Sequence, residues 1–313
     1  MKKITILVPC YNEQESVELF YTKVMQILSG IENYKFELLF VNDGSKDDTL
    51  TIIKVLREKD ENVSYLDLSR NFGKETAMIA GLDYCDGDAA IIMDVDLQDP
   101  PELIPMMIRE WENGYADVYA KRKSRQGESF CKKLTSRLYY RMLQRMTDIE
   151  IQVDVGDFRL LDRQAVQALR SMRERQRYTK GMFSWIGYKK KEILFDRNAR
   201  AAGKTKWNYF KLLGLAIDGI TAFSIIPLRL ASVLGIIISV LAFFYMGCII
   251  IRTLLYGDPV AGYPSLISIV LFIGGIQLVV LGIIGEYLGR VFNEAKQRPN
   301  YLLNEYNGQK IVL

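Results

Sequence analysis

The chain reads AAIIMDVDLQDPP from Ala89 to Pro101. Its run of apolar residues predicts a buried strand, and the carboxylates of Asp94 and Asp96 follow where that strand should end. Residues two apart on a strand project to the same side, so these two side chains can converge as the chain leaves the sheet. In parallel sheets, ligands bind at the carboxyl ends of the strands. The segment therefore predicts both a strand of an α/β sheet and a binding site at its end.

The first 120 residues contain more β-rich runs of this kind. We expect strands at Ile4–Val8, Phe36–Asn42, Val63–Leu68, Ala89–Asp94 and Asp117–Ala120. Between them, apolar residues recur at helical spacing: Val17, Phe20, Val24, Ile27 and Leu28 in one stretch, and Leu50, Ile53 and Leu56 in the next. Strands and helices in alternation predict an α/β domain with a doubly wound, mostly parallel sheet.

The last third of the chain differs in composition. Leu230–Ile251 and Pro264–Gly285 are stretches of 22 residues, and neither contains a charged side chain. As helices they would each be about 33 Å long, against a membrane hydrocarbon core of about 30 Å. Buried core helices of that length normally have a polar face. Two transmembrane helices are therefore expected within residues 230–290.

Basic residues indicate how these helices are oriented. The connection between them carries one arginine, whereas basic residues flank the pair on both sides: Lys204, Lys206, Lys211, Arg229, Arg290, Lys296 and Arg298. The positive-inside rule then places both termini in the cytoplasm, and no signal peptide is expected at the N-terminus. The expected layout is a cytoplasmic domain at 1–200, a membrane-proximal amphipathic segment at 201–229, the two spans, and a cytoplasmic tail at 291–313.

A basic amphipathic helix is expected at residues 129–147. Apolar residues alternate there with five cations: Lys132, Lys133, Arg137, Arg141 and Arg145. Such a helix suits the surface of an anionic membrane. A helix that packs on the domain and leaves its arginines in solvent fits the pattern equally well.

Composition excludes several kinds of chemistry. The chain has no histidine, so Ser-His-Asp catalysis and histidine-bound metals are ruled out. Its four cysteines, Cys10, Cys85, Cys131 and Cys248, show no paired spacing, which argues against a zinc site and against a disulfide framework. Acid, base or metal chemistry must therefore use carboxylates, lysine, tyrosine or water.

Asp94 and Asp96 are candidate metal ligands. Two carboxylates that leave a strand together repel one another unless a cation lies between them and a substrate. Oxygen ligands favour Mg²⁺ or Mn²⁺, whose coordination diphosphate oxygens typically complete. The plainer interpretation is a solvated strand end that caps the next helix.

Two other strand ends also carry polar residues. Tyr11 and Glu13 follow the first strand, and Asp43–Thr49 follows the second. Asp43 can accept a hydrogen bond from the imide N–H of a uracil, against which the Tyr11 ring could lie. Taken alone, Asp43–Thr49 is a common turn with Asp or Ser capping the next helix.

Together these motifs resemble those of a known family. Val8–Glu13, Val41–Thr49 and Asp94–Glu102 are similar to the nucleotide-sugar signature of inverting glycosyltransferase family 2, which implies a compact Rossmann-like domain of GT-A type. More closely, the chain resembles the polyprenyl-phosphate glycosyltransferases, a group that includes dolichol-phosphate mannose synthases and bactoprenol glucosyltransferases. That likeness lies in Ser69–Lys74, Gly156–Arg159 and Arg200–Trp207, and it extends over essentially the whole chain. Thr205 stands where the group usually has serine, which keeps the hydroxyl.

The resemblance implies a role for each matching residue. Those expected to hold the nucleoside are Pro9, Tyr11, Glu13 and Asp43. Asp94 and Asp96 would meet the ribose, the diphosphate and the metal, and Gln98 would lie near the sugar. Phosphate groups would be faced by Arg122, Arg200 and Lys206.

Asp157 is implied to be the catalytic carboxylate. The second pKa of a phosphate monoester is near 6, so the acceptor is already largely deprotonated at neutral pH. Asp157 would then either position Arg200 or Lys206, or remove the residual proton in the encounters that need it. The alternative is a turn or capping aspartate beside Gly156.

The implied reaction is attack of a polyprenyl (undecaprenyl) phosphate oxygen on the anomeric carbon of a UDP-sugar, with inversion. Glucose and N-acetylglucosamine are the expected sugars, and GDP-mannose is the alternative donor. A processive polysaccharide synthase would need more spans, and a non-catalytic membrane scaffold should lack carboxylates at the strand ends. The membrane is an expected partner; a homo-oligomer, a downstream flippase and a lipid-sugar-dependent transferase are compatible ones, and no nucleic acid is expected.

Overall fold

The computed structural model describes residues 1–123, 144, 152, 155–175, 177–196, 221, 224–256 and 262–311. It divides into two compact units, one formed by the N-terminal part together with residues 299–313, and the other by residues 217–298. The elements of the first unit in chain order are β1 (Lys2–Cys10), α1 (Val17–Leu28), β2 (Tyr34–Asn42), α2 (Thr49–Lys59), β3 (Val63–Leu68), α3 (Lys74–Tyr84), β4 (Ala89–Ile92), η1 (Pro101–Leu103), α4 (Ile104–Glu112), β5 (Asp117–Arg122), β6 (Val155–Asp162), α6 (Arg163–Ser171), α7 (Thr179–Trp185), β7 (Lys190–Phe195), β8 (Leu303–Tyr306) and β9 (Gln309–Lys310).

The strands of the first unit form one mixed sheet, in the order β7-β5-β6-β4-β1-β2-β3-β8-β9. Its centre, β4-β1-β2-β3, is parallel, and β5 pairs in parallel with β7. The α/β prediction and its parallel centre are confirmed. The antiparallel strands β6 and β8 were not foreseen, because each joins the sheet from a distant part of the sequence.

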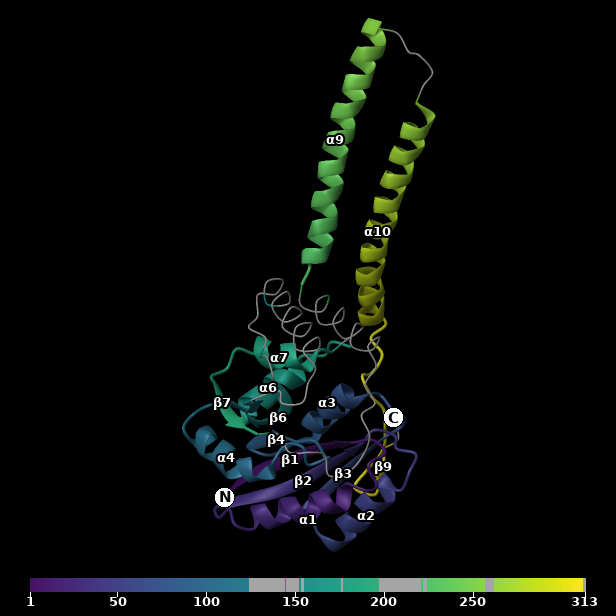
Figure 1. The fold of residues 1–313 in the computed structure, drawn as a ribbon. Helices are drawn as coiled ribbons and strands as arrows, with labels where there is room; N and C mark the ends of the chain where they lie inside the picture. Colours follow the sequence, from purple (N-terminus) through teal and green to yellow (C-terminus); the bar gives the residue numbers. More distant parts are fainter. Residues whose placement is uncertain are drawn as a thin grey trace. The chain divides into compact units, whose positions relative to one another are not determined.

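Helices cover both faces of this sheet (Figure 1). Because successive strand residues alternate between faces, Ile4, Ile6 and Phe40 pack with Phe20 of α1 and Trp111 of α4. The neighbouring positions, Leu39 and Val41, pack against Ala77 and Ala80 of α3. The apolar periodicity of α1 and α2 therefore predicted the buried faces of those helices correctly.

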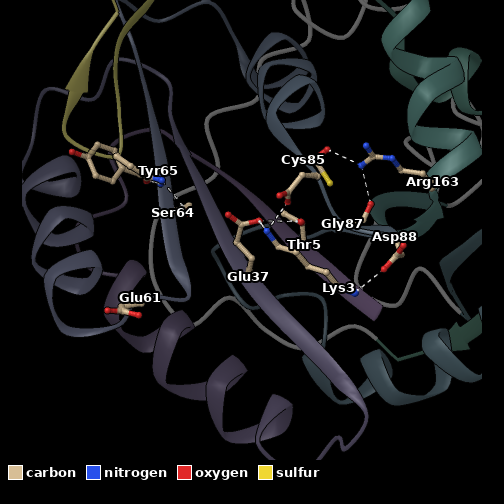
Figure 2. Close-up of polar contacts among 12 residues, drawn as sticks. Lys3, Thr5, Glu37, Glu61, Ser64, Tyr65, Cys85, Gly87, Asp88 and Arg163 are labelled. Carbon is tan, nitrogen blue, oxygen red and sulfur yellow. Dashed lines mark hydrogen bonds and ion pairs between the residues drawn. The ribbon is translucent and has the colours of Figure 1, made fainter. Parts of the chain in front are cut away.

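Polar contacts tie the elements together at the amino ends of the central strands (Figure 2). The Lys3 amide donates to Asp88 at 2.8 Å, and the Lys3 ammonium lies 3.0 Å from Glu37 on the next strand. Arg163, at the start of α6, donates to the carbonyls of Cys85 and Gly87. These contacts fix β1, β2 and the α3–β4 turn at one end, and leave the opposite, carboxyl ends for the site.

The second unit contains two long helices, α9 (Ile226–Tyr256) and α10 (Tyr263–Ala295). By length and composition, Ile226–Tyr256 and Phe272–Ala295 could each cross a membrane. Large apolar side chains are exposed along them, including Phe243, Phe244 and Leu278. Both helices extend beyond the charge-free stretches of the sequence, and Tyr287 of α10 donates to the Ser224 carbonyl just before α9.

The C-terminal residues return to the sheet. Residues 291–313 were expected to form a tail, but α10 continues to Ala295 and β8 then pairs antiparallel with β3. The Lys54 ammonium lies 2.8 Å from Glu305, which also accepts a hydrogen bond from the Tyr65 hydroxyl. The segment after α10 is thus part of the same compact unit as β1 to β7.

Candidate active site

The loops that follow β1 and β2 are joined by hydrogen bonds. Asn12, at a φ of 53°, receives Lys46 N–H on its side-chain oxygen at 2.8 Å and donates its own amide to the Ser45 hydroxyl at 3.0 Å. The Glu13 amide donates to Thr49 Oγ1 at 2.8 Å. The segment that carries Pro9, Tyr11 and Glu13 is therefore held against the loop that begins at Asp43.

Asp43 holds a third loop, which contains Phe72 and Gly73, against these two loops. Its carboxylate is only 2% exposed and accepts the amide hydrogens of Phe72 at 2.7 Å and Gly73 at 2.9 Å. Burial raises the pKa of Asp43, although these two amides and Arg70 oppose the rise. Before any nucleotide binds, this carboxylate already positions the loop that leads to Lys74.

Gly44 is required where these loops meet. Its φ of +63° lies in the left-handed region, and a Cβ added there would lie 2.4 Å from the carbonyl carbon of Arg70. Both the backbone angle and the close approach therefore demand glycine.

Lys74, the first residue of α3, links two of the expected carboxylates. Its ammonium lies 2.6 Å from Asp94 and 2.6 Å from Asp157. Burial disfavours the charged form of Lys74, but the two carboxylates prevail and raise its pKa. Asp94 and Asp157 are thus brought together, and a cation that was not assigned a role from the sequence joins them.

The pairing of β4 with β6 explains this proximity. Ile92, the last residue of β4, lies opposite Arg159 in the antiparallel register, so Asp157 lies just beyond this pair on β6, at the end of β4 where the turn with Asp94 begins. Arg159 is itself buried, with its guanidinium 3.0 Å from Asp117 of β5 and 3.7 Å from the Phe183 ring centroid. Removing one partner of such a buried pair typically costs about 3–5 kcal/mol. The pair therefore fixes β6, and with it Asp157.

Asp157 remains ionised. Burial alone would raise its pKa, but the charge and hydrogen bond of Lys74, together with the charges of Lys180 and Arg159, outweigh burial, so that the pKa falls to about 2. A carboxylate with so low a pKa is a weak base. Its stronger contribution at neutral pH is a fixed negative charge that orients Lys74.

The acidic turn after β4 differs from the expected geometry. The strand ends at Ile92, so Asp94 and Asp96 lie in the following turn and do not converge by strand alternation. Leu97 has a φ of 55°, unusual for leucine, and the Gln98 amide donates to Asp96 Oδ1 at 3.2 Å. A strand pattern cannot predict the conformation of this turn, in which the Asp96 side chain is partly exposed to solvent.

Arg122 and Gln98 have unused polar atoms near this turn. In the part of the chain that the structure describes, Nε of Arg122 and Oε1 of Gln98 are buried without a hydrogen-bond partner. A Cβ on Gly156 would lie 3.8 Å from Asp99 Oδ2 and 3.9 Å from Arg122 Nη2, so both side chains lie beside the residue that precedes Asp157. A buried guanidinium N–H without a partner is well suited to an anionic ligand.

Three expectations fall on residues that the structure does not describe. Arg200 and Lys206 lie outside the described residues, as do most of the basic helix expected at 129–147 and of the membrane-proximal segment at 201–229. Two residues of the site were given no role from the sequence: Lys74, although it lies in a quoted motif, and Asp99, which lies in the acidic turn.

Carboxylates and a lysine gather at the carboxyl ends of the parallel strands, which is where ligands bind in open α/β sheets. The model of the family described as glycosyl transferase family 2 matches residues 5–170, and the model described as the GtrB C-terminal hairpin matches residues 226–291. The chain belongs to glycosyl transferase family 2, and is a glycosyltransferase.

Several curated relatives match nearly the whole chain. An uncharacterized glycosyltransferase of Synechocystis is 46% identical over 98% of this chain and 96% of its own length. The prophage bactoprenol glucosyl transferase homolog of Escherichia coli is 43% identical over 96% of this chain and 98% of its own. The bactoprenol glucosyl transferase of Shigella phage SfV is 42% identical over the same shares of the two chains, 96% and 98%.

Solved structures are more distant. The glucosyl-3-phosphoglycerate synthase of Mycobacterium tuberculosis is 15% identical, with a TM-score of 0.46 over 70% of this chain and 78% of that one. The family assignment therefore rests on the sequence matches.

Proposed function

We propose that this enzyme transfers a hexosyl group, glucose or N-acetylglucosamine, from a UDP-sugar to undecaprenyl or another polyprenyl phosphate. The observation that carries the proposal is the arrangement of Asp94 and Asp157 on either side of the Lys74 ammonium, 2.6 Å from each. Relatives of nearly equal length that are called bactoprenol glucosyl transferases support the lipid acceptor and the glucosyl group.

The donor would bind over the three joined loops. Tyr11 and Glu13 follow β1, Asp43 follows β2, and their hydrogen bonds preorganise the surface that would receive the nucleoside. Because Asp43 is buried and already accepts two amide hydrogens, its contribution would lie as much in shaping this surface as in contacting the base. Gln98, with a buried and unused amide oxygen, would lie near the sugar.

The residues present fit a divalent cation bound together with the donor. Among the described residues no cluster of three or more metal-binding side chains occurs, so the chain itself would supply Asp94 and Asp96 and the diphosphate would supply further oxygens. Bound there, Mg²⁺ or Mn²⁺ would neutralise the charge that develops on the departing UDP. Lys74 would then exchange its contact with Asp94 for one with the substrate while it keeps Asp157.

The acceptor brings negative charge to a donor that is already negative, so cations must meet it. Arg122, whose Nη2 lies beside Gly156 and whose buried Nε has no partner among the described residues, would contact a phosphate there. Arg200 and Lys206 are assigned the same task by resemblance. Asp157, whose pKa is about 2, would hold Lys74 in place, because a phosphate monoester with a pKa near 6 does not give its proton up readily to such a weak base. The acceptor oxygen would attack as the dianion, on the face of the sugar opposite UDP.

The two long apolar helices would anchor the enzyme in the cell membrane, with the catalytic domain and both termini in the cytoplasm. Pairing of β8 with β3 supports this orientation, since the chain after α10 rejoins the domain that precedes α9. A hairpin whose two ends belong to one folded domain must enter and leave the membrane on the same side. Arg229 before α9 and Arg290, Lys296 and Arg298 at the end of α10 agree with the cytoplasmic side.

A donor panel tests the proposal. The purified full-length enzyme would be given undecaprenyl phosphate with radiolabelled UDP-glucose, UDP-N-acetylglucosamine or GDP-mannose, and label extracted into the organic phase would be counted. We expect transfer from one UDP-sugar and little from GDP-mannose. Preference for GDP-mannose would replace the donor assignment, and absence of lipid product from all three would favour a non-catalytic scaffold.

A further inference from the structure

The C-terminal strand β8 contacts the framework of the donor loops. Asp67 of β3 is 8% exposed, and its two carboxylate oxygens accept hydrogens from two amides. Asn42 Nδ2, at the end of β2, donates to one oxygen at 2.7 Å, and Asn304 Nδ2 of β8 donates to the other at 3.1 Å. Asn304 therefore shares a carboxylate with a residue that directly precedes Asp43.

A β-bulge gives Asn304 this position. Asp67 pairs with Glu305 and Leu68 pairs with Leu303, so Asn304 is an extra residue in β8 that faces no partner in the ladder. Bulges commonly redirect a side chain in this way. The Asn304 amide thus reaches Asp67 although the strand register alone would not bring it there.

The shared carboxylate determines how the Asn42 amide is turned. A carboxylate can only accept, so the Asn42 NH₂ must face Asp67 and its oxygen must face away. That oxygen accepts the Ser45 amide at 3.3 Å, and the Ser45 hydroxyl in turn accepts the Asn12 amide at 3.0 Å. A second link runs alongside, because the Leu302 carbonyl accepts the Ser69 amide at 2.9 Å, just before the loop that Asp43 holds.

We propose that β8 is a positioning element of the donor site, in which Asn304, through Asp67 and Asn42, holds the loop at Asp43–Lys46 in its nucleotide-binding conformation. The inference rests on the proposed function in taking these loops as the donor site. It adds that residues reached by the chain only after both long helices help to shape nucleotide binding, so the C-terminal segment serves the donor site as well as the sheet edge.

The test compares Asn304→Leu with Asn307→Ala in the full-length protein. Leucine is similar to asparagine in size, and its apolar side chain fills the space in which a water molecule could otherwise replace the lost N–H donor to Asp67. Asn307 also anchors the tail, since its side chain accepts from Tyr65 N at 2.8 Å and donates to Ser64, but it has no contact with Asp67 in the described hydrogen bonds (Figure 2 shows Ser64 and Tyr65). Two quantities would be measured: the Kd for UDP with Mg²⁺, and hydrogen exchange of the Ser45 and Lys46 amides without ligand.

We expect Asn304→Leu to weaken UDP binding about 3- to 10-fold and to speed exchange at Ser45 by a similar factor, because a hydrogen bond to a charged group is lost. Asn307→Ala should lower the Tm but change neither quantity. Asp67→Asn should resemble Asn304→Leu, since both neighbouring amides then compete for one acceptor oxygen. Adding Asn304→Asp to Asp67→Asn should restore binding to within about twofold, because donor and acceptor are exchanged across the same contact.

The inference would be overturned if Asn304→Leu bound UDP and exchanged its Ser45 amide as the wild type does, or if Asn307→Ala lost as much. It would also be overturned if the double variant did not recover UDP binding, or if the Asn304→Leu protein did not fold. If the wild-type enzyme bound no UDP, the donor assignment would fail, yet exchange at Ser45 would still decide the role of β8.

Discussion

Replacing Lys74 with methionine should reveal how strongly the two central carboxylates depend on it. The substitution removes the ammonium that lies 2.6 Å from both Asp94 and Asp157, while it retains most of the side-chain volume. Asp157 then loses the strongest of the interactions that oppose its burial, so its pKa should rise from about 2 towards the ordinary value of 3.8.

The magnitude follows from the Asp157 pKa. In the wild type it is about 2 against 3.8, a difference of nearly two pKa units, or about 2 kcal/mol of stability. Because the folded-state pKa is lowered, this stability is present above pH 3.8 and is lost as the pH falls through about 2. The Lys74 side chain is 42% exposed, so solvent screening makes about 2 kcal/mol an upper limit.

Thermal unfolding followed by intrinsic fluorescence in detergent would measure the effect. At pH 7, Lys74→Met should lower the Tm by at most about 4–8 °C, and the difference from wild type should shrink at pH 4 and below. Lys123→Met is a matched control, because its partner Asp196 is 75% exposed and the pair should contribute less than about 1 kcal/mol. An unchanged Tm at pH 7, or a difference that grows as the pH is lowered, would show that Lys74 does not stabilise the ionised form of Asp157.

Four further outcomes are expected. Asp157→Asn should reduce turnover about 100-fold or more with UDP-sugar affinity nearly unchanged, and the loss should stay constant from pH 6 to 9 if positioning is its role; a loss that fades with rising pH would mean base catalysis. Asp96→Asn should abolish turnover without lowering the Tm, and an unchanged rate with Mg²⁺ or Mn²⁺ present would exclude it as a ligand. Gly44→Ala should weaken UDP binding and cost about 1–3 kcal/mol of stability, whereas Gly114→Ala, with positive φ but open space, should leave binding unchanged, a contrast that isothermal titration can check. A cysteine replacing the exposed Gln309 should resist membrane-impermeant thiol reagents added from outside intact cells, and its labelling would contradict the cytoplasmic orientation.

Local patterns were enough to predict the central strands and the first helices. Ile4–Val8 and Phe36–Asn42 lie within β1 and β2, and Phe20 and Ile53 are buried as their spacing indicated. Long-range pairing could not be predicted in this way. β8 meets β3 across more than two hundred residues of sequence, and no local signal marks Leu303–Tyr306 as a strand of the first unit.

The polar residues at the strand ends were enough to predict most of the site. Lys74, which was given no role, could be recognised only from the tertiary structure. Asp94 and Asp157 were named for separate tasks, but only the antiparallel pairing of β4 with β6 brings the strand that carries Asp157 to the end of β4. From the sequence, Lys74 lay in a motif but was given no role. Its charge can be assigned a role only once the fold places it between those two carboxylates. The acidic turn was expected as a strand end, and the left-handed Leu97 that shapes it has no sequence signature.

We expect this enzyme to form a phosphodiester-linked lipid sugar by direct displacement. The most direct measurement is to incubate the full-length protein with UDP-glucose, undecaprenyl phosphate and Mg²⁺, identify the extracted lipid by mass spectrometry, and determine its anomeric configuration by NMR. We predict undecaprenyl phosphate carrying one hexose of configuration opposite to that in the donor, with UDP released in equal amount. A product of retained configuration, or release of free glucose without any glycolipid, would contradict the account.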